Sequence, residues 1–301
     1  FYDADVGAIE FADVDNDGDL DFMATGKGTP MQDPILSTLY KNDGSGNFTE
    51  VVNAPFVDVF GGAIGFADID NDGDLDLFIT GNTQGGTKSA ELYTNDGTGN
   101  YSIVTGTPFE PNWGGDFAFA DMDGDGDQDL IMTGINQQDD ALTKLYINNG
   151  SGAFSEVAGT SLEQLGLSSV EFFDYDGDND QDILIAGEND ADVPFTKLYA
   201  NNGSGIFTEV INTPFENVSG GDIAIADSDN DGDQDVFISG ETTTNGTYFT
   251  NLYINNGMGS YSGMTNSSFP DAMSGETDFA DFDNDGDLDL LITGFGSGGI
   301  I

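Results

Sequence analysis

The sequence predicts an all-β fold, a β-propeller of four-stranded blades, and three observations support this. An acidic nine-residue motif occurs six times, a Leu-Tyr hairpin motif occurs five times between its copies, and the flanking residues alternate as in β-strands. Repeats of about 50 residues with four strands each have the length of propeller blades, whereas an open β-solenoid, the alternative, usually has shorter repeats. We expect one domain over 1–301, six- or seven-bladed when closed, with repeats at about 1–57, 58–110, 111–163, 164–216, 217–270 and, incomplete, 271–301.

Each repeat divides into four expected strands. Large apolar and small residues alternate before the acidic motif, as at 117–120, which predicts a first strand with one large-residue face. A short apolar run ending in glycine follows the motif, as at 130–132, and predicts a second strand buried on both faces. The third strand carries the Leu-Tyr pair, and an Asn-Asp-Gly or Asn-Asn-Gly hairpin turn leads into a fourth strand such as 207–210. The sixth repeat shows only two strands, so either the polypeptide continues beyond Ile301 or the ring closes unusually.

The acidic motif, D-x-D-x-D-G-D-x-D, has the spacing of a cation-binding loop. Aspartates at positions 1, 3, 5 and 9 converge on one ion when the chain curls around it, and position 7 adds a main-chain carbonyl. The sharp turn at position 6 is made by glycine in five loops and by Asn179 in the fourth, and asparagine is the residue that best tolerates a left-handed backbone after glycine. Flexible all-oxygen ligation favours Ca²⁺ over Mg²⁺.

We expect one calcium ion in each of the six loops, which are numbered 1 to 6 along the chain. A solvated acidic turn is the alternative for a single motif, but six copies with five aspartates each at fixed spacing would repel strongly without a cation. The expected ligands are Asp13, Asp15, Asp17, Asp19 and Asp21; Asp68, Asp70, Asp72, Asp74 and Asp76; Asp121, Asp123, Asp125, Asp127 and Asp129; Asp174, Asp176, Asp178, Asp180 and Asp182; Asp227, Asp229, Asp231, Asp233 and Asp235; and Asp281, Asp283, Asp285, Asp287 and Asp289.

The loops do not fit the EF-hand pattern. An EF-hand needs a bidentate Glu at position 12 and helices on both sides. Position 12 is instead an apolar residue within an expected strand: Ala24, Ile79, Met132, Ile185, Ile238 or Ile292.

The composition excludes several function classes. With 56 acidic residues against five lysines, no arginine and a net charge of −51, the chain has no surface for nucleic acid and does not favour an anionic membrane. The absence of His and Cys excludes Ser-His and Cys-His nucleophiles, and no carboxylate pair for glycoside hydrolysis stands out, so we expect no enzyme. A cysteine-free chain without an apolar run of transmembrane length favours a bacterial secreted or cell-surface protein without membrane insertion.

The run FADIDNDGDLDLFITG at 66–81, with its LYTNDGTGN hairpin at 92–100, resembles the FG-GAP repeat, also called the VCBS-type repeat, of integrin α-subunit propellers and bacterial secreted proteins. The resemblance covers the whole chain. It implies a propeller, commonly seven-bladed, with calcium in the loop that joins the first two strands of a blade. It also implies that partners bind the opposite face, and that the ligands lie at positions 1, 3, 5, 7 and 9. Similar propellers also occur in lectins and in polysaccharide-degrading enzymes.

Strand parity places the acidic loops and the Asn-Gly turns at one end of each blade. The connections between second and third strands lie at the other end and diverge between repeats, at 27–37, 82–91, 135–143, 188–195 and 241–249. A constant frame with variable loops at one end is typical of binding scaffolds. We therefore expect an adhesion or partner-binding module whose ligand, an extracellular protein or a glycan, binds opposite the calcium. A carbohydrate-binding lectin-like propeller, or a domain of a polysaccharide-degrading enzyme, is the alternative. Trp113, the only tryptophan, is a candidate ligand-binding residue, and packing between blades is an equally good interpretation.

Overall fold

The structure is a computed structural model of the chain, and it describes residues 4–5, 7–28, 34–242, 247–265, 269–296 and 299–300. These residues form strands, turns and loops, and among them is no helix that could span a membrane. The prediction of an all-β fold is confirmed. Parts of the variable connections 27–37 and 241–249 lie outside the described residues.

Five repeats each contain four antiparallel strands in the order first, second, third, fourth. The first strands are β2 (Ile9–Ala12), β6 (Ile64–Ala67), β11 (Phe117–Ala120), β15 (Gly166–Phe173), β19 (Ile223–Ala226) and, in the sixth repeat, β23 (Thr277–Ala280). The second strands are β3 (Asp21–Gly28), β7 (Asp76–Asn82), β12 (Asp129–Asn136), β16 (Asp182–Glu188), β20 (Asp235–Glu241) and β24 (Asp289–Ile292). The third strands are β4 (Ile35–Asn42), β8 (Lys88–Asn95), β13 (Ala141–Ile147), β17 (Pro194–Ala200) and β21 (Tyr248–Asn255). The fourth strands are β5 (Phe48–Glu50), β9 (Tyr101–Ile103), β14 (Ser155–Glu156), β18 (Thr208–Val210) and β22 (Tyr261–Gly263).

Four short strands lie outside this scheme. β1 (Ala4–Asp5) pairs with β3, and β10 (Asn112–Trp113) pairs with both β8 and β12, so it joins the second and third sheets. β25 (Phe295–Gly296) and β26 (Gly299–Ile300) form a hairpin after β24, which the sequence did not indicate.

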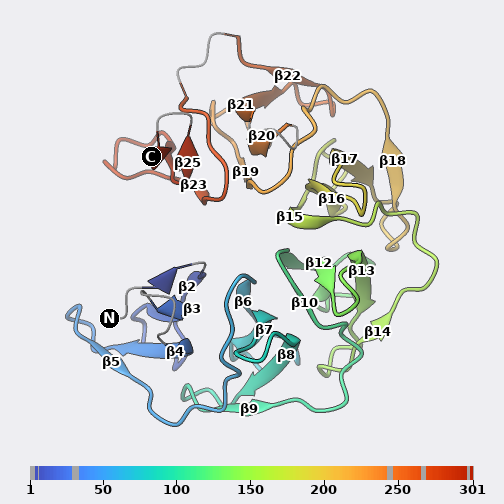
Figure 1. Cartoon of the computed structure of the whole chain (residues 1–301). Coiled ribbons are helices and arrows are strands. Elements are labelled where there is room, and N and C mark those ends of the chain that lie inside the picture. The colour runs from blue at the N-terminus through green and yellow to red at the C-terminus, as the bar shows by residue number, and fades with distance from the viewer. Residues whose placement is uncertain are drawn as a thin grey trace.

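The sheets follow one another around a common centre (Figure 1). The fourth strands β5, β9, β14, β18 and β22 lie on the outside of this arrangement. The first strands of all six sheets line a central cavity of 1790 Å³.

The hydrophobic core consists of five clusters, each between two consecutive sheets. The Leu-Tyr pair of the third strand explains part of this pattern, because successive side chains of a strand point to opposite faces. Leu92 contributes to the cluster with the third sheet and Tyr93 to the cluster with the first, and both are fully buried. The second to fifth sheets are therefore covered on both faces, as the short apolar runs of their second strands predicted.

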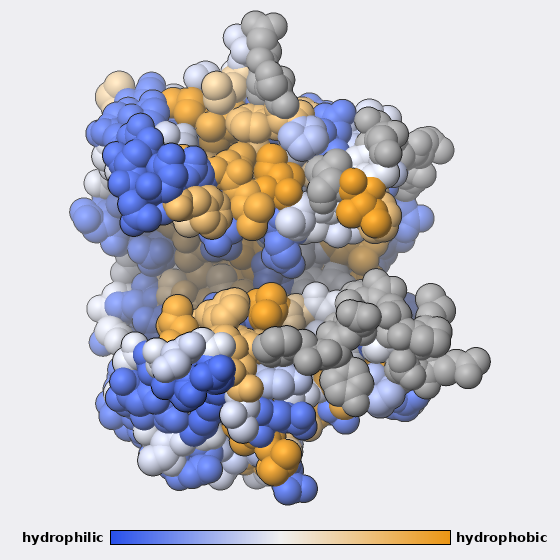
Figure 2. Space-filling model, turned by 90° about the vertical axis from the view of Figure 1, so that its left-hand side faces the viewer, coloured by the Kyte–Doolittle hydropathy of each residue, from blue (hydrophilic) through white to orange (hydrophobic). Residues whose placement is uncertain are grey.

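The sixth sheet differs from the other five. Leu291 in β24 is 49% exposed, whereas its counterparts in the other second strands, such as Ile131 and Phe237, are 0% exposed. Phe11 in the first sheet is also exposed, and no hydrophobic cluster of described residues joins the first and sixth sheets. Figure 2 shows this side of the molecule, with apolar surface on both sides of a groove. The prediction of a buried second strand at 290–292 is therefore wrong for this sheet, because nothing described covers its outer face.

The acidic loops join the first strand of each sheet to the second, and the hairpin turns join the third strand to the fourth. Because neighbouring strands are antiparallel, both kinds of connection lie at the same end of the sheet. The connections between second and third strands lie at the opposite end, where they meet the segments that enter the next sheet, as in the pairing of Ser89 with Asn112.

Candidate metal centre

All six acidic loops have the same internal framework. The carboxylate at position 1 accepts hydrogen bonds from the backbone N–H groups at positions 5 and 6; in loop 2 both bonds from Asp72 and Gly73 to Asp68 are 3.1 Å long. The turn at position 6 has positive φ throughout, from 92° to 97° at the glycines and 70° at Asn179. The prediction that Asn179 takes the left-handed conformation is confirmed. Position 12 lies within a second strand in every loop, so these are not EF-hands.

The aspartates at positions 1, 3, 5 and 9 converge within the loops. Oxygen atoms of three aspartates lie within 4.8 Å of one another in each of five groups: positions 1, 3 and 5 in loops 1 and 5, and positions 1, 3 and 9 in loops 2, 3 and 4. In loops 2, 3 and 4 the group brings carboxylates from both ends of the loop around one point.

The position-3 aspartates carry the evidence that this point fits a cation. One oxygen, Oδ1, is buried without a hydrogen-bond donor in Asp15, Asp70, Asp123 and Asp176. A buried acceptor without a partner is costly, by about 1–3 kcal/mol, and more for a charged group. An oxygen-only donor set of this kind suits a hard cation such as Ca²⁺.

The position-9 aspartate is fixed at the start of the second strand. In loop 3, Asp129 is fully buried and accepts hydrogen bonds from the N–H of Met122 at 3.2 Å and of Asn148 at 2.8 Å. Burial raises the pKa of Asp76 and of Asp129 to about 6 and that of Asp182 to about 7, and the aspartates at positions 3 and 5 add to this effect. A bound cation would favour the charged form and oppose the shift.

The position-7 aspartates point elsewhere. An added Cβ at Gly97 or Gly150, the hairpin glycines with φ of 76° and 74°, would lie 2.5 Å from a carboxylate oxygen of Asp74 or Asp127. These carboxylates therefore lie against the hairpin turn, and position 7 belongs to none of the five named groups. Its contribution to an ion would come from the main-chain carbonyl.

In the second to fifth repeats, an asparagine at the end of the third strand ties the acidic loop to the preceding one, a contact that was not among the predictions from the sequence. Asn148 is 1% exposed, and its Nδ2 donates to Ile69 O in loop 2 at 2.7 Å and to Gln128 O in loop 3 at 3.1 Å. Asn95, Asn201 and Asn255 make the corresponding pairs of bonds. The signal was present as the asparagine after each Leu-Tyr pair, which we had assigned only to the turn.

Loop 1 has a basic neighbour. Lys41 Nζ lies 3.0 Å from Asp15 Oδ2 and donates to Thr98 O. Among the ion pairs of the described residues, this is the only one that involves an acidic-loop aspartate.

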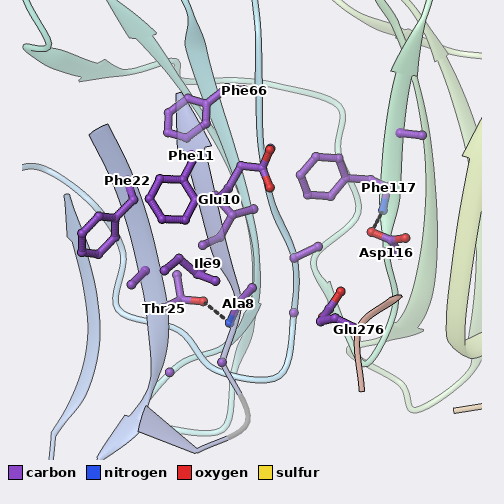
Figure 3. Close-up of a pocket in the computed structure, with 18 of the residues that line it drawn as sticks. Ala8, Ile9, Glu10, Phe11, Phe22, Thr25, Phe66, Asp116, Phe117 and Glu276 are labelled. Carbon is purple, nitrogen blue, oxygen red and sulfur yellow. Dashed lines mark hydrogen bonds between the residues drawn. The ribbon is translucent and has the colours of Figure 1, made fainter. Parts of the chain in front are cut away.

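The central cavity brings together a second group of carboxylates. Figure 3 shows Glu10, Asp116 and Glu276 around it, with aromatic rings such as Phe117. Asp116 accepts a hydrogen bond from Val170 N in the next sheet at 3.2 Å, and Asp222 accepts one from Thr277 N at 2.7 Å, so both link neighbouring sheets. Burial raises the pKa of Asp116 to about 7.

Glu171 lies in the same cavity, and burial, reinforced by Asp116 and Asp222, raises its pKa to about 8. These carboxylates were not among the predicted site residues, although Asp116, Asp222 and Glu276 each lie five residues before the first aspartate of their loop. Trp113 lies in β10, half-buried between the second and third sheets, which suits the packing interpretation and leaves its role in ligand binding a prediction.

Comparison with known proteins supports the repeat assignment. A family model described as an FG-GAP-like repeat matches residues 13–79, 68–132, 121–185, 174–238 and 227–292, and each match begins at the first residue of an acidic loop. A search of curated proteins gave no match.

Among solved structures, the crystal structure of the V. cholerae biofilm matrix protein Bap1 is similar to this chain, with a TM-score of 0.47 and 16% sequence identity. The similarity covers 92% of this chain and 42% of the Bap1 chain, so this chain spans less than half the length of that protein. A similarity of this degree does not identify a function.

Proposed function

The chain belongs to the FG-GAP-like repeat family, and we propose that it is a calcium-stabilised β-propeller that acts as an extracellular adhesion or partner-binding module. The observation that carries the calcium assignment is the buried, unpartnered Oδ1 of the position-3 aspartate, repeated in four loops. Calcium in each loop would be held by carboxylates at positions 1, 3, 5 and 9 and a main-chain carbonyl at position 7. The positive charge of the ion would stabilise the curled loop, which joins the first strand to the second.

The propeller arrangement is supported by the order of the sheets. Consecutive sheets follow one another around one centre (Figure 1), and each consecutive pair shares a hydrophobic cluster. First strands line the central cavity, as the inner strands of propeller blades do.

The partner-binding role is supported by the difference between the two ends of the sheets. Loops and hairpin turns at the calcium end repeat nearly unchanged, as expected of a frame. The opposite end carries connections that differ in length, charge and aromatic content, which suits recognition. We propose that an extracellular protein or glycan binds there, that the chain has no catalytic role, and that it binds neither nucleic acid nor membrane.

Calcium dependence is tested by thermal unfolding with EDTA, with 5 mM Ca²⁺ and with 5 mM Mg²⁺. Sites with Kd of ~10⁻⁴–10⁻³ M, typical of extracellular modules, add about 1–2 kcal/mol per occupied loop by mass action. We expect a clear rise in Tm with Ca²⁺ and little with Mg²⁺. A melting temperature indifferent to EDTA would remove calcium from the proposal.

Two substitutions in loop 4 make the test specific. Asp176→Asn alters the position-3 oxygen that faces the expected ion, whereas Asp180→Asn alters a carboxylate that lies against Gly203 of the hairpin. We expect the first to reduce the calcium-dependent stabilisation by about 1–2 kcal/mol and the second to leave it unchanged. Equal losses would contradict the assignment of positions. A glycan array, followed by hydrogen exchange of any complex, tests the partner face; protection confined to the acidic loops would overturn that part.

A further inference from the structure

One kind of side-chain hydrogen bond, from position 4 of a loop to position 7 of the next, joins some neighbouring acidic loops and not others. The asparagine at position 4 of one loop donates through Nδ2 to the position-7 carboxylate of the next: Asn16 to Asp74 at 2.8 Å, Asn71 to Asp127 at 2.8 Å, and Asn230 to Asp287 at 3.0 Å. These bonds connect loops 1, 2 and 3 in series and loop 5 with loop 6.

Loop 4 takes part in no bond of this kind, although Asp174 N donates to Gln234 Oε1 of loop 5 at 3.0 Å. Position 4 is Gly124 in loop 3 and Gly177 in loop 4, which have no side chain to donate. Asn284 in loop 6 donates to no other acidic loop among the described residues. The links are thus a property of individual residues rather than of the repeat.

We propose that Asn16, Asn71 and Asn230 are positioning residues that couple calcium binding in one loop to calcium binding in the next. These bonds then couple loops 1–3 as one group and loops 5 and 6 as a second. This inference rests on the proposed calcium binding.

The geometry on the donor side ties each bridge to the curl of its loop. Asn16, Asn71 and Asn230 have φ between 59° and 60°, a left-handed conformation that belongs to the curled loop. An ion that holds the curl therefore also holds the asparagine side chain in reach of the next loop.

On the acceptor side, the asparagine bonds to the side chain of the position-7 aspartate, and the main-chain carbonyl of that aspartate is an expected ligand of the ion. The backbone N–H of Asp127 donates to the position-5 carboxylate of Asp125 at 3.0 Å, so Asp127 is fixed both within its own loop and by Asn71. Loss of Asn71 would leave this residue less ordered before the ion binds. By linkage, coupling of this kind is reciprocal: occupancy of loop 3 must favour occupancy of loop 2 equally.

The test is hydrogen exchange of the whole chain, with exchange read separately in each loop as Ca²⁺ is added to metal-free protein. Asn71→Gly removes one link and should fold, because glycine occupies the same position in loops 3 and 4 with φ of 79° and 81°. We expect the calcium midpoint of loop 3 to rise by about two- to tenfold, the value of one ordinary hydrogen bond exposed to solvent. Asn284→Gly is the matched control. Because Asn284 has no link to another loop, this change should leave the calcium midpoints of loops 1 to 5 unchanged.

A second variant adds a link. An added Cβ at Gly177 meets nothing within 4 Å, and asparagine already occupies this position in four loops, so Gly177→Asn can bring an Nδ2 group towards Asp233. We expect it to lower the midpoint of loop 5 and to make the midpoints of loops 4 and 5 interdependent.

The outcomes separate the coupling from calcium binding itself. If every loop becomes protected but loop 3 has the same midpoint in wild type and Asn71→Gly, the coupling is refuted while the proposed function stands. The same holds if Asn284→Gly shifts loop 3 as strongly as Asn71→Gly does. If no loop gains protection with Ca²⁺, the proposed function and the coupling both fail.

Discussion

Asn148 offers the sharpest test of how consecutive sheets are held together. Its Nδ2 bonds to Ile69 O and Gln128 O lie in a buried environment, and its Oδ1 accepts from Asn149 N at 2.8 Å and Gly150 N at 3.2 Å. Asn148→Ala removes all four bonds and leaves the carbonyl of Ile69 without this donor. The bond to Gln128 O contributes about 1 kcal/mol and the buried Ile69 carbonyl left without its donor costs about 1–3 kcal/mol, while water replaces part of the turn bonds. We expect a loss of about 2–4 kcal/mol.

The neighbouring Asn149 provides the matched control. It is exposed, and its Oδ1 accepts only from its own turn, from Ser151 N at 3.1 Å, Ser151 Oγ at 2.8 Å and Ala153 N at 3.3 Å. Asn149→Ala should cost about 1 kcal/mol or less, because water can replace these bonds.

Urea unfolding followed by tryptophan fluorescence suits this comparison. Trp113, the only tryptophan, lies in β10 between the second and third sheets, the same interface that Asn148 bridges. Measurements in excess EDTA separate the loss in the free energy of unfolding from any change in calcium binding. If Asn148→Ala costs no more than Asn149→Ala, the sheets are held by apolar packing alone and the reasoning is wrong.

Three further predictions concern pH, charge and the binding face. In the folded state the pKa of Glu171 is about 8 and that of Asp116 about 7, both above their ordinary values. Their contribution to the free energy of unfolding is therefore favourable below about pH 4 and is lost as the pH rises to about 8. Glu171→Gln should flatten this fall in the free energy of unfolding, measured between pH 5 and 9 in EDTA. Lys41→Met should lower the calcium midpoint of loop 1 in hydrogen exchange, because it removes the cation 3.0 Å from Asp15, whereas Lys27→Met, beside the Phe60 ring, should have no effect. Trp113→Ala should weaken binding of a partner, while Ser45→Ala and Ser204→Ala in the hairpin turns at the calcium end should not; the reverse pattern in a binding assay would place the partner at the acidic loops.

Much of this architecture follows from local patterns. Three features each depend on only a few neighbouring residues: the alternation in the first strands, the turn at position 6 and the Asn-Gly hairpins. The sequence therefore predicts them correctly in every repeat that contains them. The convergence of positions 1, 3, 5 and 9 is also local, because nine residues contain every carboxylate involved. The loops therefore appear in the structure where the spacing placed them.

Contacts between repeats could not be predicted in the same way. The bond from Asn148 to Ile69 spans 79 residues, and it depends on the angle between consecutive sheets, which no short pattern specifies. The same reason applies to the direction of the position-7 carboxylates and to the carboxylates of the central cavity. The exposure of Leu291 is likewise a matter of what lies beside the sixth sheet rather than of its own sequence.

The balance of charge connects calcium with the place where the protein would work. Thirty of the 44 aspartates lie in the six loops, at one end of the sheets, and the only ion pair to a loop aspartate among the described residues is that of Lys41. Metal-free loops would therefore concentrate negative charge around buried oxygens such as Asp70 Oδ1, which opposes the curled conformation. Under the proposed function, sites of modest affinity fill at millimolar calcium and remain empty at the micromolar level of a cell interior. The chain would then reach full stability only outside the cell, where the proposed partner is also found, and the asparagine links would sharpen this dependence within loops 1–3 and 5–6 by making each occupied loop favour the next.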